Sequence, residues 1–190
     1  MHPDVEAVMA ELDAHRMQFI VLSRSLSGEQ LNRPVRQSAW LVRDYIAHLA
    51  TIDGPVGEMF HAVHGGSDAG IRGADGERWD VDSWNEDRIQ ERRALSIDEL
   101  LMAAAIERTK LRGYMAALTE NDLATTIKFQ GDARRPPSEV ELRAYLRGWC
   151  KHDVMHAVDM MRAVPERMSP RLEHWFNDPV VAWYQKAMNG

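Results

Sequence analysis

Residues 138–163, SEVELRAYLRGWCKHDVMHAVDMMRA, decide the fold. Their apolar and aromatic residues recur at alternating steps of three and four, which is the spacing of one face of an α-helix. This stripe consists of Leu142, Tyr145, Trp149, His152, His156, Asp159 and Ala163. Ser138 and Glu141 have the spacing of a capping box, so we expect one helix from Ser138 to about Ala163, just before Pro165.

Helical spacing recurs over most of the chain. A first helix is expected from Val8 to Leu26, and a second from Ser38 to Gly65, with a kink at Gly54-Pro55 because proline lacks the N–H of a helix hydrogen bond. Trp84-Asn85-Glu86 begins a short helical piece, and a capping box at Ser96 begins a helix that reaches about Leu118. Four main helices with two long connections predict an all-α four-helix bundle with crossover loops.

The connections and the tail have their own patterns. Residues 65–82 are rich in Gly and Asp and indicate an exposed loop, in which Asp80 and Asp82 are better explained as loop residues than as a calcium site. Residues 119–137 form the second connection, with a candidate strand at Thr125–Phe129. We expect a bundle domain over 1–164, and a tail over 165–190 with a short helix that packs on the bundle or on a partner.

Composition excludes several classes of protein. The 190 residues carry 23 Lys+Arg against 29 Asp+Glu, a net charge of −6 without a basic cluster, which argues against nucleic acid as a partner. The longest apolar run is too short to span a bilayer and Met1–Asp4 does not resemble a signal peptide, so we expect a cytoplasmic protein that binds a small molecule and no membrane. Cys150 is the only cysteine and is best explained as a small core residue, so any metal must bind mainly through nitrogen or oxygen. A homodimer is left open.

Three histidines stand on predicted buried stripes. His152 and His156 are four residues apart, so both rings leave the same helix face and can share one metal ion. His48 lies on the stripe of the second helix and can add a third nitrogen, while Asp44, one turn earlier, either orients that ring or favours the helix start. Three histidines from two helices predict a metal site with open positions. From spacing alone, three core histidines bonded to carbonyls or water are equally favoured.

The other five histidines have ordinary explanations. His61 and His64 lie in the last turn of a helix, where the helix dipole favours an imidazole. His15 is on the apolar stripe of the first helix and is best explained as a core residue. His2 and His174 lie near the ends of the chain, and no argument attaches to them.

Two motifs resemble those of a known family. Residues 26–50, LSGEQLNRPVRQSAWLVRDYIAHLA, contain a Trp-x-x-Arg-Asp-x-x-x-His-Leu pattern, and residues 152–156 read His-Asp-x-x-His. Both resemble motifs of the DinB/YfiT-like superfamily, and Trp84-Asn85-Glu86 is similar to a motif of its mycothiol-dependent maleylpyruvate isomerase branch. Over residues 1–164 the resemblance implies a helical bundle with His48, His152 and His156 as ligands of nickel, zinc or iron. Many relatives have Gln where this chain has Asp159, which is open as a fourth ligand, as an acceptor for a ligand ring, or as an Asp facing water.

The resemblance also implies an activity. We expect a metal-dependent S-transferase or isomerase that uses a thiol such as bacillithiol, mycothiol or glutathione on a small electrophile. Relatives of the isomerase branch carry a further C-terminal domain, whereas about 26 residues follow Val164 here, which argues against the isomerase activity itself. Two alternatives are a metal-dependent hydrolase, with Asp159, Asp153 or Glu86 as general base, and a non-catalytic stress-associated protein that binds a ligand and a structural metal.

Overall fold

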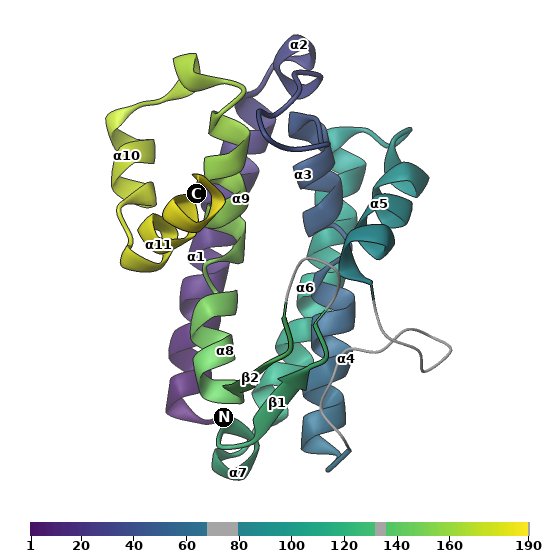
Figure 1. Ribbon diagram of the computed structural model, residues 1–190, viewed down its shortest axis with the longest axis vertical. Helices are drawn as coiled ribbons and strands as arrows, with labels where there is room; N and C mark the ends of the chain where they lie inside the picture. The colour runs from purple at the N-terminus through teal and green to yellow at the C-terminus, as the bar shows by residue number, and fades with distance from the viewer. Residues whose placement is uncertain (68–79, 132–135, 190) are drawn as a thin grey trace.

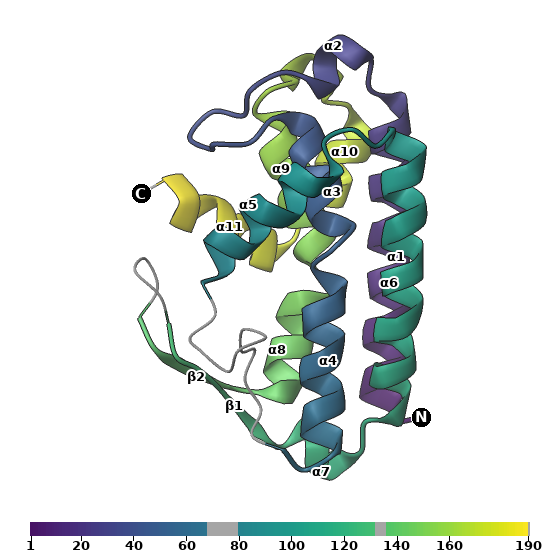
Figure 2. The ribbon, with the colours of Figure 1, turned by 90° about the vertical axis from the view of Figure 1, so that its right-hand side faces the viewer.

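A computed structural model describes residues 1–67, 80–131 and 136–189 of the chain. Two straight helices, α1 (Pro3–Ser25) and α6 (Ile97–Ala117), run side by side, and a third leg of the bundle consists of α3 (Val42–Leu49) and α4 (Asp53–His64) (Figure 2). The fourth leg consists of α8 (Leu142–Trp149) and α9 (His152–Met161) (Figure 1). The predicted helical bundle is therefore confirmed, but two of its four legs are broken.

The second predicted helix begins later than expected and is interrupted rather than kinked. The hydroxyl of Ser38 accepts the Trp40 N–H within a turn, and the helix begins only at Val42, where the Asp44 carboxylate accepts the Leu41 N–H at 2.9 Å. Asp44 thus stabilises the helix start and does not orient a ring.

The interruption lies at residues 50–52, ahead of the predicted kink. Pro55 has no N–H for the Thr51 carbonyl, which accepts instead from Gly54 N–H at 3.2 Å. The chain turns there, and Pro55 falls in the first turn of α4, where a missing N–H costs nothing.

The helix predicted from Ser138 to Ala163 is wrong at its start and at its middle. Residues 138–141 form β2 (Ser138–Glu141), which pairs antiparallel with β1 (Thr126–Phe129), the strand that was expected. The N–H of Leu142 bonds to the Thr125 carbonyl at 2.9 Å, so pairing with a distant strand overrides the capping box. The helix breaks a second time at Cys150-Lys151. There the N–H of Lys151 bonds to the carbonyl of Gly148, three residues earlier, at 3.1 Å and closes a tight turn.

The predicted helix starts near residues 84 and 96 and the two predicted connections are confirmed in part. The capping box at Ser96 is confirmed, and Trp84-Asn85-Glu86 lies inside α5 (Val81–Arg92), whose start is capped by Asp80. Asp80 and Asp82 are therefore helix-start residues, while most of the predicted 65–82 loop, residues 68–79, lies outside the described residues, as do residues 132–135 of the second connection. Short helices α2 (Gly28–Leu31) and α7 (Glu120–Leu123) complete the connections.

The tail holds more structure than the single helix expected. It contains a 3-10 turn, η1 (Pro165–Arg167), and two helices, α10 (Pro170–Phe176) and α11 (Pro179–Asn189), both lying against α9 (Figure 1). The division of the chain at residue 164 stays a prediction. Of the helices in the described ranges, none has the length and apolar character needed to cross a bilayer.

The apolar core is split into two clusters along the bundle. One gathers at the end that holds α3 and α9, with Ile46, Leu100 and Val154 fully buried, and the other at the end that holds α4 and α8, with Phe60 and Leu142 fully buried. Both broken legs are interrupted where the clusters meet. Polar side chains of the residues next to the two breaks therefore face each other between two apolar layers.

Candidate metal centre

Three imidazoles meet at the level of the helix breaks. His48 comes from α3, and His152 and His156 come from the first two turns of α9. Each offers one ring nitrogen, and the three nitrogens lie within 4.8 Å of one another. The Nε2 atoms of His152 and His156 are 3.1 Å apart, and the His48 ring meets the His156 ring edge to face at 4.9 Å between centroids. The structure thus brings together the three residues that the sequence singled out.

The spacing of the nitrogens is compatible with a shared divalent ion. Bonds of about 2.0–2.1 Å from the ion place neighbouring ligand nitrogens roughly 3.0–3.4 Å apart. The His152–His156 pair already has this separation, and the third ring would need to close by at most about 1.4–1.8 Å. Among the residues that the structure describes, none bonds the buried Nδ1 atom of His48, which is unusual for a buried polar atom.

Burial keeps two of the rings neutral. His48 is 4% exposed, and desolvation lowers its pKa well below the usual value, helped by the nearby His156. Burial also lowers the pKa of His152 well below its usual value, and the charges of His156 and His48 act in the same direction. A neutral imidazole has a free lone pair, so both rings are held in the form that binds metal.

Asp159 contacts the outer side of the ligand set. Its Oδ2 atom lies 3.2 Å from Nδ1 of His156, which leaves Nε2 of that ring turned toward the other histidines. The same Oδ2 accepts a hydrogen bond from the Tyr184 hydroxyl at 2.6 Å. Of the readings left open for Asp159, the geometry favours an acceptor for a ligand ring.

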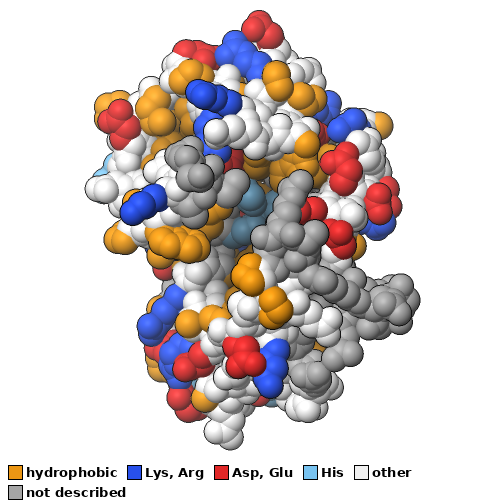
Figure 3. All heavy atoms as spheres, in the orientation of Figure 1, with side chains coloured by type: hydrophobic (Ala, Val, Ile, Leu, Met, Phe, Trp, Pro, Cys, Tyr) orange, Lys and Arg blue, Asp and Glu red, His pale blue; other side chains and the backbone are white. Residues whose placement is uncertain are grey.

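Aromatic side chains surround the three rings. Trp149 stacks on His152 with 4.3 Å between centroids, Trp40 lies 5.2 Å from His48, and Tyr45 lies 5.4 Å from His156. Figure 3 shows histidine side chains at the bottom of a hollow near the centre of one face of the molecule, with hydrophobic side chains around it. A small molecule that enters this hollow would meet the imidazoles and apolar rings together.

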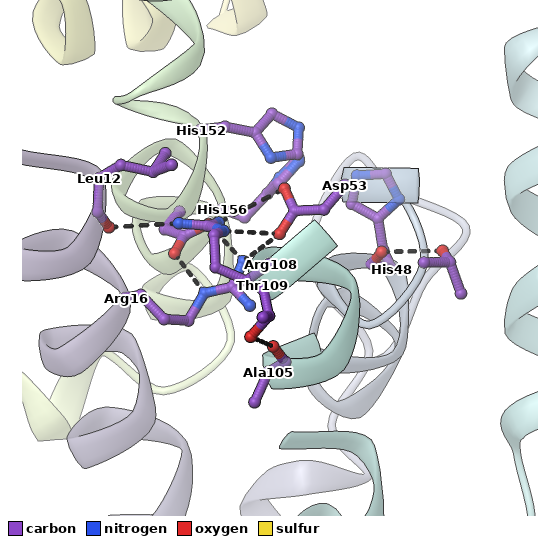
Figure 4. Close-up of polar contacts among 11 residues, drawn as sticks. Leu12, Arg16, His48, Asp53, Ala105, Arg108, Thr109, His152 and His156 are labelled. Atoms are coloured by element: carbon purple, nitrogen blue, oxygen red, sulfur yellow. Dashed lines mark hydrogen bonds and ion pairs between the residues drawn. The ribbon is translucent and has the colours of Figure 1, made fainter. Parts of the chain in front are cut away.

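A buried ion-pair cluster adjoins the histidines (Figure 4). Arg16 and Arg108 bind Asp53 and Asp153, with Arg16 Nε to Asp153 Oδ2 at 2.6 Å and Arg108 Nε to Asp53 Oδ2 at 2.7 Å. All four side chains are less than one-tenth exposed, and we call them the ion-pair quartet. Sequence reasoning missed Arg16, Asp53 and Arg108, although each arginine stands on the apolar stripe of its helix, and a charge in such a stripe signals a buried partner.

One of the predicted general bases, Asp153, is held within the ion-pair quartet. Asp153 bonds both arginines, whose charges hold its pKa down to about 2 against the effect of burial, so its carboxylate is fully engaged. Glu86 lies on the exposed side of α5, bonds Gln90 at 2.6 Å and is not brought to the histidines. Its neighbour Asn85 is buried beside His48 and counteracts the lowering of that pKa.

The remaining histidines have other partners. His15 Nδ1 accepts from the Trp175 indole at 2.9 Å, and His64 lies 3.0 Å from Asp122 at the end of α4. His61, in the same last turn, contacts the Tyr114 ring, and His2 caps α1 by accepting the Asp4 N–H.

Cys150 is not available for chemistry. It is 1% exposed at the end of α8, and burial raises the pKa of its thiol to about 12. The predicted role as a small core residue fits this position.

The fold and the site together are those of an all-α bundle with a potential three-histidine metal site between two of its legs. The model of the DinB superfamily matches residues 11–160, and the chain belongs to this superfamily. Two solved structures are similar, those of the mycothiol-dependent maleylpyruvate isomerase and of a histidine-to-alanine mutant of it, each with a TM-score of 0.61 and 13% sequence identity over 84% of this chain. The chain spans 63% of the length of that isomerase. A comparison with curated proteins finds no match.

Proposed function

We propose that this protein is a divalent-metal enzyme that activates a low-molecular-weight thiol for reaction with a small electrophile. One observation carries the proposal. The ring nitrogens of three imidazoles converge within 4.8 Å of one another, and within the described ranges no cysteine, aspartate or glutamate joins their group as a fourth ligand. Figure 3 shows histidine side chains at the bottom of a hollow. Three protein ligands are typical of a catalytic site, whereas structural sites are usually closed by four.

The chain itself points to an external thiol. Its only cysteine is buried, and the high pKa of that thiol keeps it protonated. A divalent ion held by the histidines would lower the pKa of an incoming thiol and stabilise its thiolate form. The similar solved structures belong to an isomerase whose name states that it depends on mycothiol, which supports this class of reaction.

The expected reaction is balanced without a redox partner. The thiol loses its S–H proton to solvent, and the thiolate forms a C–S bond with the electrophilic carbon. In a transferase this bond remains and a leaving group departs with the electron pair. In an isomerase the thiolate adds to a C=C bond conjugated to a carbonyl group, and the π electron pair moves onto the carbonyl oxygen as an enolate. The former double bond is now single and rotates, the enolate expels the thiolate as the C=C bond re-forms, and the thiolate regains a proton from solvent on release. The aromatic rings of Trp149 and Tyr45 would contact the apolar part of the electrophile.

Metal analysis of protein purified without a nickel column tests the proposal. We expect about one divalent ion per chain in the wild type and less than about a tenth of that in His152→Ala, because two ligands rarely hold a labile ion. The matched control is His174→Ala, which removes an exposed histidine of α10 and should keep the metal. Metal retained in His152→Ala would show that the ligand set is wrong.

Thiol consumption is the second arm. Glutathione, mycothiol and bacillithiol are each offered with a panel of electrophiles, and loss of free thiol or a shift of the electrophile's spectrum is followed with and without chelator. We expect turnover that chelation abolishes. Stoichiometric metal without any turnover would contradict the enzyme and leave a binding protein whose metal is structural.

A further inference from the structure

The C-terminal helix α11 contacts the histidine cluster through one side chain. Tyr184 lies outside the residues matched by the superfamily model, which end at 160. Its hydroxyl nevertheless donates a hydrogen bond of 2.6 Å to Oδ2 of Asp159, on the neighbouring helix α9. A residue of the tail thus touches the carboxylate that contacts His156.

Asp159 uses one oxygen for both partners. Its Oδ2 faces the Tyr184 hydroxyl and Nδ1 of His156, the latter at 3.2 Å. Oδ1 is buried and, of the residues that the structure describes, none donates a hydrogen bond to it, with Arg162 Nη1 at 3.6 Å. Asp159 is 2% exposed, so water does not compete for Oδ2. A buried carboxylate with few partners depends strongly on each of them.

The direction of these bonds matters for His156. A carboxylate at Nδ1 accepts the proton of that nitrogen and leaves the lone pair of Nε2 free, and Nε2 is the atom that faces His152. Burial and the nearby Asp159 raise the pKa of Tyr184, so its hydroxyl remains a donor. The hydroxyl therefore fixes the carboxylate, and the carboxylate fixes the ring.

We propose that α11 completes the metal centre: Tyr184 is a positioning residue that orients His156 through Asp159 and so raises the affinity of the three histidines for a divalent ion. The inference rests on the proposed metal site but not on the thiol reaction. Because coupling between two events is reciprocal, metal binding also stabilises the docking of α11 on α9.

The test measures zinc affinity by competition with a chromogenic chelator. Tyr184→Phe keeps the ring and removes only the hydroxyl, and we expect a loss of affinity of about 3- to 10-fold, at or below the 10- to 100-fold range typical of outer partners of metal ligands. Asp159→Asn should cost about 10- to 100-fold. The matched control is Tyr114→Phe, which removes a hydroxyl bonded to Glu58 at 3.1 Å on the surface and should bind zinc as the wild type does.

Two further measurements separate positioning from general structural support. The double variant Tyr184→Phe/Asp159→Asn should bind zinc no more weakly than Asp159→Asn alone, because both changes act on the same ring. The visible absorption of the cobalt-loaded protein should change in Tyr184→Phe and not in Tyr114→Phe. Hydrogen exchange of α11 should slow when zinc is added to the wild type, and this zinc effect should shrink in Tyr184→Phe.

The outcomes are distinct. Wild-type affinity in Tyr184→Phe, or additive losses in the double variant, would overturn the role of Tyr184 while leaving the metal site intact. A wild-type protein that binds no zinc would overturn both this inference and the proposed function. Zinc binding without thiol turnover would refute only the proposed reaction.

Discussion

Two buried polar clusters lie side by side in this bundle and are satisfied in opposite ways (Figure 4). In the ion-pair quartet two guanidinium groups face two carboxylates, so charge is balanced and most donors have an acceptor within the cluster. In the histidine cluster three imidazoles face each other, two of their nitrogens approach to 3.1 Å, and His48 Nδ1 has no partner within the described part of the chain. The charges of the quartet are balanced within it, although Nη1 of Arg16 has no hydrogen-bond partner among the described residues, whereas the histidines are arranged for a group that the chain does not supply.

The clusters also differ in what they connect. The quartet joins α1, α4, α6 and α9 through Arg16, Asp53, Arg108 and Asp153, whereas the three histidines come from α3 and α9 alone. Asp153 and His152 are consecutive residues, so the quartet also holds the first turn of α9, from which His152 projects. The ion-pair quartet therefore stabilises the bundle and positions the histidine cluster, and the histidine cluster is arranged to bind a metal ion.

The largest expected effect is on the quartet. Arg108→Met keeps the length of the side chain and removes its charge, leaving Asp53 and Asp153 with one arginine between them. We expect the free energy of unfolding to fall by about 3–5 kcal/mol, the usual cost of breaking a buried ion pair by removing one partner. Urea denaturation in the presence of chelator measures it.

An exposed ion pair provides the control for this change. Arg24→Met removes the partner of Asp98, and both of those side chains are more than half exposed, so the expected loss is within about 1 kcal/mol. If Arg108→Met lowered the free energy of unfolding no more than Arg24→Met does, the ion-pair quartet would not be the cluster that stabilises the bundle.

The next effect is the response of the metal-free protein to pH. Burial lowers the pKa values of His48 and His152 in the folded state, so the unfolded chain binds more protons as pH falls below about 6.5, the ordinary histidine value. Stability is therefore fully present above that pH and is lost below it, by up to about 1.4 kcal/mol per pH unit for each ring.

The quartet responds in another range of pH. The lowered pKa of Asp153, about 2, keeps its contribution constant down to about pH 4 and removes it only under more acidic conditions. Unfolding of wild type and His48→Gln between pH 7.5 and 5 measures the contribution of His48 together with its effect on the pKa of His152, because groups away from the cluster titrate equally in both. An equally steep slope in the variant would contradict the neutral state of His48.

The three histidines could be predicted from the sequence because a helical stripe fixes the direction of its side chains. His152 and His156 continue the stripe of Tyr145 and Trp149, and that stripe survives the break at residues 150–151. The outer partner Asp159 stands on the same stripe, but Tyr184 belongs to a helix whose docking no local pattern reveals.

The helix breaks and the quartet could not be predicted for a physical reason. Whether Ser138 starts a helix or a strand depends on pairing with β1, and the N–H of Leu142 is satisfied by Thr125, far away in the sequence. Arg16 and Arg108 stand on the apolar stripes of their helices, which signals a buried partner for each but does not say which one. Only the packing of four helices brings them to Asp53, so their partnership depends on the fold as a whole.

The smallest expected effect is the change in stability when one histidine of the cluster is replaced in the metal-free protein. His152→Leu replaces a half-buried ring by an apolar side chain of similar volume next to Trp149, and it removes the nitrogen that lies 3.1 Å from Nε2 of His156. In chelator we expect the free energy of unfolding to stay within about 1 kcal/mol of the wild type, since replacing imperfectly satisfied buried polar groups by apolar ones is often neutral. Zinc at about 100 times its dissociation constant should then stabilise the wild type by about 2.7 kcal/mol and leave the variant unchanged. A metal-free variant destabilised as strongly as Arg108→Met would mean that the histidines stabilise the fold as the quartet does, and the distinction between a structural cluster and a binding cluster would fail.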